Sequence, residues 1–244
     1  MSNALTDTAA PANPLTQVRS ILAQPAIKRS LPLIFMLLGL ILRGVAFEFR
    51  FKAHDHERHF WDKAFIVGSI AAAFFQGVAL GAYIEGIPVV NRAFAGGTFD
   101  WFAPFPLFTG LGVVAVYAML GSTWLIMKTE GPLQARMIQL SRPLIGLLIA
   151  FIVAVSIWTP LAHASIAQRW FSWPNMLWFA PVPLLVLFFT VQLLRSLRGE
   201  PHVAPFVYVL GLVFLGYTGL AISVWPMIIP PDISIWQAAA PPQS

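Results

Sequence analysis

The chain has 244 residues, of which 58% are hydrophobic and only 10% are charged, whereas a soluble globular domain carries about 25% charged residues. This composition excludes an ordinary water-soluble domain and indicates an integral membrane protein. The formal net charge is +5, but the basic residues lie in short segments between apolar runs rather than on one face, which argues against a nucleic-acid partner.

The first 30 residues form a polar segment, rich in Pro and Ala, that we expect to be mobile and that lacks the features of a cleavable signal peptide. Six apolar runs follow, each close to the roughly 20 helical residues that cross a bilayer. We predict an all-α integral membrane protein, with about six transmembrane helices in a polytopic bundle over residues 31–228 and a short outer tail at 229–244. The runs lie at residues 31–49, 64–85, 104–127, 143–163, 177–194 and 204–228.

The first run is interrupted by Arg43, and Glu48 and Arg50 follow it between phenylalanines in RGVAFEFR. A charge inside hydrocarbon costs at least about 2.5 kcal/mol, so such an arginine needs a partner or a route to the interface. Glu48 is five residues on, about 140° around a helix, and therefore faces Lys52 rather than Arg43. Two interpretations stay open for Arg43. Its side chain reaches the bilayer boundary about 9 Å away, or it contacts another helix, another chain or a quinone headgroup.

The segment after the first run holds HDHERH at residues 54–59, which a metal site or a solvated loop would explain. The spacing matches no known zinc pattern, so we favour the loop. The sequence has no cysteine, and no histidine lies inside a predicted span, so we predict that this chain ligates neither haem nor metal. All five histidines lie in loops or at span ends: His54, His56, His59, His163 and His202.

The second run ends at Glu85, directly before Gly86 and Pro88, which mark a helix end. We therefore interpret Glu85 as a boundary acid rather than as a carboxylate in a proton path. Other polar residues within or near the spans are expected to bond to neighbouring helices: Gln76, Ser122 and Thr123.

The basic residues are concentrated in alternate connecting segments, 50–63, 128–142 and 195–203, whereas the other connections hold a single arginine each. By the positive-inside rule these three segments face the cytoplasm of a bacterial inner membrane, and both termini face outward. Some basic residues then lie on the outer side, against the usual trend: Arg92 and Arg169 in the alternate connections, and Arg19, Lys28 and Arg29 in the N-terminal segment.

Four stretches resemble one family: FMLLGLILRGVAFEFRFKA, DWFAPFPLFTGLGVVAVYAMLGSTWLIMKTEGPLQ, FLGYTGLAISVWPMIIPP and DISIWQAAAPPQS. They are similar to subunit II of the bacterial cytochrome bd-type quinol oxidases, including the cyanide-insensitive branch. With weaker similarity between them, they cover residues 31–244. The combination of RGVAFEFR with TWLIMKTEG is the most specific part of the resemblance.

The resemblance implies a non-haem subunit of a terminal oxidase that couples quinol oxidation to the reduction of oxygen to water. In the family, subunit I ligates all the haems and supplies the main quinol site, so this chain would belong to an oxidoreductase without carrying its catalytic haems. By resemblance, Arg43, Glu48 and Arg50 occupy a charged motif that serves assembly and the haem environment rather than bond making. The implied partners are subunit I, quinol or ubiquinone, a small accessory subunit and membrane lipid, with a bound structural quinone as a further ligand.

The chain also departs from the family, which has about nine spans where this sequence shows six. The first two family helices and the last one have no counterpart, so we expect an incomplete subunit that does not support oxidase activity alone. Pro132 stands where the family usually has an acidic residue, and Glu85 where it more often has glutamine. A small polytopic permease is the alternative function, although the sequence lacks the paired, broken helices with polar midplane groups that are typical of transporters.

Overall fold

The computed structural model describes residues 25–86, 89–90, 93–94, 97, 99–199, 202–230 and 233–239. Within these residues six helices are long and apolar enough to cross a membrane, which confirms the predicted all-α membrane fold. The predictions that involve Arg19, Arg92 and the side chains of Lys28 and Arg29 lie outside the described part of the chain. The six helices are α2 (Pro25–Lys52), α3 (Asp55–Glu85), α4 (Pro104–Lys128), α5 (Pro132–Ala162), α8 (Pro181–Ser196) and α9 (Ala204–Val224). The short α7 (Asn175–Phe179) directly precedes α8.

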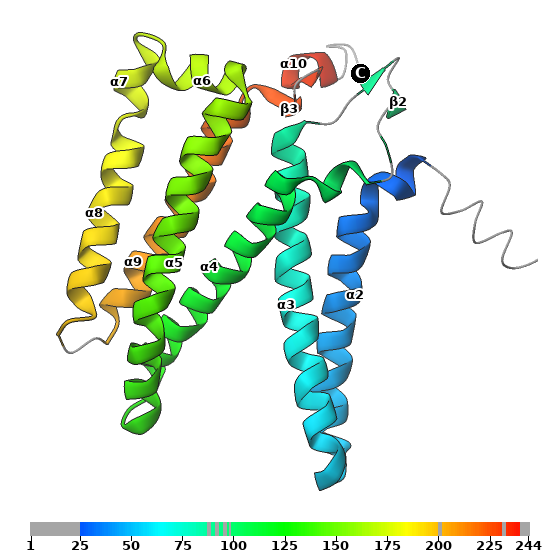
Figure 1. The fold of residues 1–244 in the computed structure, drawn as a ribbon, viewed down its shortest axis with the longest axis vertical. Coiled ribbons are helices and arrows are strands. Elements are labelled where there is room, and N and C mark those ends of the chain that lie inside the picture. The colour runs from blue at the N-terminus through cyan, green and yellow to red at the C-terminus, as the bar shows by residue number, and fades with distance from the viewer. Residues whose placement is uncertain are drawn as a thin grey trace, which may run out of the picture.

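Short elements join the long helices at one end of the molecule (Figure 1). The short α6 (Ala164–Phe171) docks on the end of α9, because Trp170 donates to the Ser223 hydroxyl at 2.9 Å. The remaining elements are two antiparallel strand pairs, β1 (Val89–Val90) with β2 (Ala93–Phe94) and β3 (Met227–Ile229) with β4 (Ile233–Ser234), the 3-10 helix η1 (Asp100–Phe102) and α10 (Ile235–Ala238).

Several helices extend beyond the runs expected from hydropathy. The prediction of a loop at HDHERH is wrong, because α3 begins at Asp55 and includes most of it. Most of the predicted 128–142 connection is helical as well, since α5 begins at Pro132. Hydropathy marks only the part of a helix that lies in hydrocarbon, and charged residues continue the helix into water through pairs such as Arg58 with Asp55 at 2.8 Å. In the other direction, α9 ends at Val224, just before Pro226.

Small residues let α3 approach both of its neighbours closely. A Cβ atom added to Gly68 would lie 2.8 Å from the backbone nitrogen of Arg43 on α2 and 2.8 Å from the Gly39 carbonyl oxygen. A Cβ atom on Gly81, further along α3, would lie 2.6 Å from the Cα atom of Pro106 on α4. Such close contacts between backbones are how membrane helices associate without a hydrophobic driving force.

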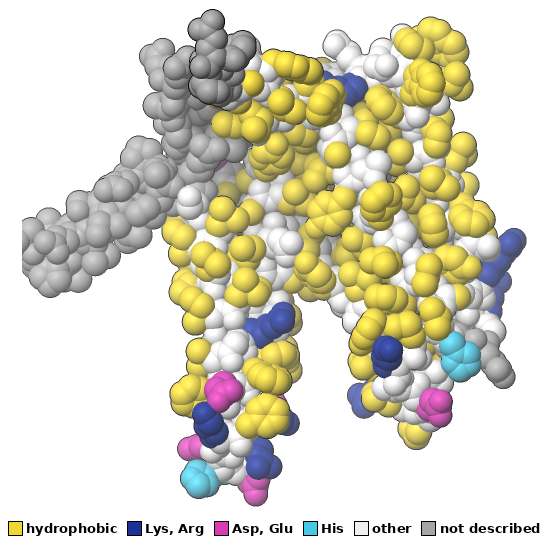
Figure 2. All heavy atoms as spheres, turned by 180° about the vertical axis from the view of Figure 1, so that it is seen from behind, with side chains coloured by type: hydrophobic (Ala, Val, Ile, Leu, Met, Phe, Trp, Pro, Cys, Tyr) yellow, Lys and Arg dark blue, Asp and Glu magenta, His cyan; other side chains and the backbone are white. Residues whose placement is uncertain are grey.

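The apolar core lies among α4, α5, α8 and α9 and includes Met119, Ile126, Ile145, Leu193 and Val209, all of which are buried. The α2–α3 pair diverges from α5, α8 and α9 toward the end that carries the α2–α3 turn, and α4 runs obliquely between them (Figure 1). Figure 2 shows an open notch between these two parts and charged side chains gathered at the tips of both. The three basic connecting segments therefore share one end of the molecule, as their alternation along the sequence requires.

Candidate functional site

The charged residues predicted from RGVAFEFR lie on the half of α2 that leads to the α2–α3 turn. Glu48 pairs with Lys52 at 2.7 Å, which confirms the predicted i, i+4 contact and leaves Glu48 away from Arg43. Arg50 reaches across to α3 and pairs with Asp62, to which its Nε donates. All these side chains are exposed in the single chain, so each pair contributes little to its stability.

Arg43 lies deeper, seven residues or about 10 Å along α2 from Arg50. Its guanidinium carbon is 5.9 Å from the centroid of the Phe65 ring on α3, a cation–π contact. Within the described residues no carboxylate pairs with Arg43, and its side chain is exposed. The structure thus gives Arg43 an aromatic neighbour on another helix and leaves its five N–H donors without an acidic partner in the described chain.

The structure unites Arg43 and Arg50 into one surface and separates Glu48 from it. Arg43 and Arg50 are seven residues apart on one face of α2, and they meet Phe65 and Asp62, which are three residues apart on α3. Sequence reasoning missed Phe65 and Asp62, because their register against α2 is set by the close approach at Gly39 and Gly68. The i, i+7 spacing of the two arginines was the available signal.

Four polar residues follow one another at intervals of seven along α3: Asp62, Ser69, Gln76 and Tyr83. We call this set the polar stripe of α3. Ser69 donates to the carbonyl of Phe65 in its own helix at 2.7 Å. Tyr117 on α4 donates to the amide oxygen of Gln76 at 3.0 Å, which confirms that Gln76 bonds to a neighbouring helix. Tyr83 donates to the carbonyl of Ile228 at 3.1 Å and so ties α3 to β3.

Ser122 and Thr123 were also expected to bond to a neighbouring helix, and Ser122 does. Ser141 on α5 donates to the Ser122 hydroxyl on α4 at 3.0 Å, and both side chains are buried. Thr123 instead donates to the carbonyl of Met119 in its own helix at 2.8 Å. These contacts are structural, since every participant is already paired inside the bundle.

Three titratable groups lie at or near helix boundaries at the end of the molecule opposite the α2–α3 turn. The helix α3 ends at Glu85, as Gly86 predicted, and Gly86 takes φ 104°. His163 stands at the C-terminus of α5, and Asp100 accepts from the Gly97 backbone at 2.6 Å. No group of three or more His, Asp or Glu side chains in the described part of the chain is placed to hold a metal ion.

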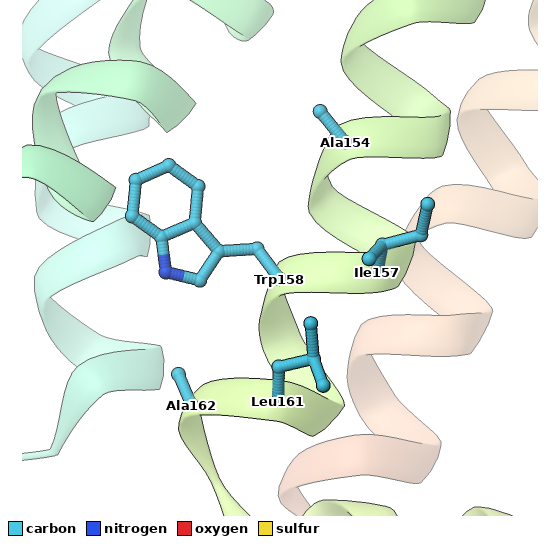
Figure 3. A pocket seen from close by; sticks show the side chains of 5 residues that line it. All are labelled: Ala154, Ile157, Trp158, Leu161 and Ala162. Atoms are coloured by element: carbon cyan, nitrogen blue, oxygen red, sulfur yellow. The ribbon is translucent and has the colours of Figure 1, made fainter.

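One hollow on the surface of the described chain is lined by apolar side chains of α5. It has a volume of about 480 Å³ and is lined by Ala154, Ile157, Trp158, Leu161 and Ala162 of α5 (Figure 3). The Trp158 ring extends from α5 to pack with Phe105 and Phe108 of α4, 5.6 and 5.7 Å between ring centroids. None of these five lining residues carries a charged or titratable side chain.

Comparison with known proteins places these features in a family. The family described as cytochrome bd terminal oxidase subunit II matches residues 26–244. A probable cytochrome oxidase subunit 2 of Haemophilus influenzae is 32% identical over 129 residues, 50% of this chain and 34% of that protein. Cytochrome bd-I ubiquinol oxidase subunit 2 of Escherichia coli is 31% identical over 110 residues, 43% of this chain and 29% of that protein.

A third relative, cytochrome bd ubiquinol oxidase subunit 2 of Bacillus subtilis, is 28% identical over 127 residues, 51% of this chain and 37% of that protein. The aligned part therefore spans between 29% and 37% of the length of these relatives. The comparisons lend no support to the permease alternative. Because the family match covers nearly all of the described helices, the chain belongs to the cytochrome bd terminal oxidase subunit II family.

Proposed function

We propose that the chain is the non-haem subunit of a membrane-bound terminal oxidase that oxidises a quinol and reduces oxygen to water. The observation that carries this proposal is the family match over residues 26–244. In this role the chain binds a haem-bearing subunit I, whose haems perform the redox chemistry, and itself supports assembly and stability. Ubiquinol is the proposed reductant, because the Escherichia coli and Bacillus subtilis relatives are subunits of ubiquinol oxidases. A bound quinone and a small accessory subunit belong to the same proposal and rest on family resemblance alone.

The proposed contact with subunit I includes Arg43, with Glu48 and Arg50 beside it. An arginine within a transmembrane helix costs about 2.5–3.5 kcal/mol unless an acceptor is supplied. The Phe65 ring neutralises no charge, so an anionic or carbonyl group from another molecule would lower this cost. Arg50 is held by Asp62 at the wet end of the same surface, and Glu48 is held by Lys52 on another face of α2 beside it. Both pairs would fix the register of the contact.

We further propose that the end with the α2–α3, α4–α5 and α8–α9 connections faces the cytoplasm of a bacterial inner membrane. Basic residues concentrate at this end, and the positive-inside rule assigns such an end to the cytoplasm (Figures 1 and 2). The residues that support the assignment are Arg50, Lys52, Arg58, Lys63, Lys128, Arg136, Arg142, Arg195 and Arg198.

The experiment is to co-produce this chain with the haem-bearing subunit from the same genome in a host that lacks its own quinol oxidases. Membranes from these cells should consume oxygen when a ubiquinol analogue is added, and membranes with the haem-bearing subunit alone should consume much less. Equal oxygen consumption with and without this chain would overturn the proposed function.

A further inference from the structure

The short helix α6 lies at the level where membrane-spanning helices end. The span formed by α5 ends at Ala162 and the next span begins at Asn175, so that only residues 163–174 lie between two crossings of the bilayer. Figure 1 shows α6 running across this end of the molecule, transverse to α5 and α8. A segment this short between two spans stays close to the boundary between hydrocarbon and water.

Two side chains hold α6 against the last turn of a third span, α9. Trp170 donates to the Ser223 hydroxyl at 2.9 Å. Arg169 donates to the carbonyl of Ile222 at 3.4 Å, which gives the guanidinium a partner inside the chain. The level of α6 is therefore that of the end of α9 at Val224.

The side chains of α6 divide into three rows. The first faces the protein and consists of Ile166, Arg169 and Trp170, which are buried or half-buried. The second is polar and exposed, and spacings of three and four residues keep it on one side of the helix: Ser165, Gln168 and the C-terminal cap Ser172. The third is apolar and exposed, and contains Ala164 and, seven residues on, Phe171, which is 66% exposed. An exposed side that is polar along one row and apolar along another is typical of a helix lying in a membrane interface.

Exposed aromatic side chains continue from α6 toward α8. Trp173 is 80% exposed and Trp178 is 75% exposed. The indole N–H of Trp170 has an acceptor within the chain, whereas those of Trp173 and Trp178 have none among the described residues. Tryptophans of this kind are enriched at membrane interfaces, where the ring rests on acyl chains and the N–H reaches headgroup oxygens or water.

The bilayer is the occupant that these observations favour, because it already surrounds the adjoining spans. The exposed apolar surface of α8, for example Leu184 at 65%, follows directly after Trp178 along the chain. Water alone would leave the aromatic side chains in an unfavourable solvent. A protein that covered the whole exposed side would also remove water from Ser165 and Gln168, whose side chains have no hydrogen-bond partner in the described chain. A membrane interface suits both rows.

We propose that residues 164–178 form an interfacial anchor that lies in the boundary region of one leaflet of a phospholipid bilayer. The side chains of Phe171, Trp173 and Trp178 contact the upper acyl chains, and the polar row of α6 faces water. Interfacial helices bury their apolar face about 5–10 Å into this region. Through Trp170 and Arg169 the anchor fixes the level of α9 in the membrane. The proposal needs only the membrane spans and does not depend on the proposed function.

Spin labels on single cysteines test the anchor. The sequence has no cysteine, so Gln168→Cys and Phe171→Cys each add one thiol, and the unaltered chain treated in the same way gives the background. The labelled chain, with any subunit that co-purifies, is reconstituted into vesicles of phosphatidylethanolamine and phosphatidylglycerol. Collisions of the label with oxygen, which concentrates among acyl chains, are compared with collisions with a water-soluble nickel complex.

We expect the ratio of oxygen collisions to nickel collisions to be severalfold higher at position 171 than at position 168. Gln168 is the matched control, because it is exposed and lies three residues away on the other exposed row of the same helix. If the nickel complex reaches both positions equally, the segment lies in water and the proposal is overturned. If neither reagent reaches the label at 171, a protein covers this row, and the proposal is overturned as well.

A second pair of positions keeps the test decisive if one of these variants fails to fold. Ser165→Cys reports the polar row, and Leu177→Cys reports the apolar surface, where Leu177 is 65% exposed. The same severalfold difference is expected, and a ratio at 177 no higher than at 165 would contradict the anchor. Because the measurement needs no haem-bearing partner, a negative result leaves the proposed function standing, and failure of the proposed function leaves the anchor standing.

Discussion

Arg43 is the residue on which the proposed contact with subunit I depends most. Its guanidinium lies over an aromatic ring instead of beside a carboxylate, about 10 Å along α2 from Arg50. Lys52, at the end of the same helix, is paired with Glu48 and exposed. Substitutions of Arg43 and Lys52 can therefore be compared directly, because Arg43 has no acidic partner in the described chain and Lys52 is paired and exposed.

We expect Arg43→Leu to lower the haem content of membranes that carry the complex by about tenfold, the loss expected when a charged hydrogen bond at a poorly solvated contact is removed. Lys52→Leu should change haem content by less than about twofold, because an exposed pair contributes little. Haem absorbance per unit of tagged chain measures both. Equal haem content in the two variants would mean that Arg43 only reaches for the bilayer boundary.

At the scale of elements, α3 is the helix that packs closely against both α2 and α4. It meets α2 through Gly68 and α4 through Gly81, and two members of the polar stripe, Ser69 and Gln76, lie between these two contacts along the helix. An added methyl group at Gly68 has backbone atoms of α2 as its nearest neighbours, so it cannot be accommodated by a side-chain rotation.

We therefore expect Gly68→Ala to destabilise the purified complex by about 1–3 kcal/mol through separation of α2 from α3. Gly146→Ala on α5 is the control, because a Cβ atom there meets nothing within 4 Å. Thermal unfolding in detergent, followed by circular dichroism, should show a lower midpoint for the first variant only. A midpoint for Gly68→Ala at or above that of the unaltered complex would contradict the glycine-mediated contact.

The six transmembrane helices could be predicted from the sequence because each is a long apolar run, and hydropathy reads such runs directly. The ends of these helices could not be predicted from the sequence, because charged helical turns such as the start of α3 have the composition of a loop. At the candidate site, Arg43 and the Glu48–Lys52 pair follow from local spacing on one helix. Phe65 and Asp62 do not, because they depend on the register between two helices.

At the scale of the whole molecule, the charge distribution predicts the orientation in the membrane. The chain has no cysteine, so a single introduced cysteine reports one position without background. We expect His56→Cys and Gly199→Cys to resist a membrane-impermeant maleimide in intact cells, whereas Ser172→Cys at the opposite end should react. Labelling after cell lysis confirms that each thiol is accessible. The reverse pattern would contradict the proposed orientation.

We propose that this chain is a non-haem subunit that binds a haem-bearing one. The most direct measurement is the ratio of haem to chain in material purified through a tag on this chain, with and without the co-produced partner. We expect haem in a fixed ratio to the chain when the partner is present and no haem when the chain is produced alone. Stoichiometric haem on the isolated chain, or none in the co-produced preparation, would contradict it.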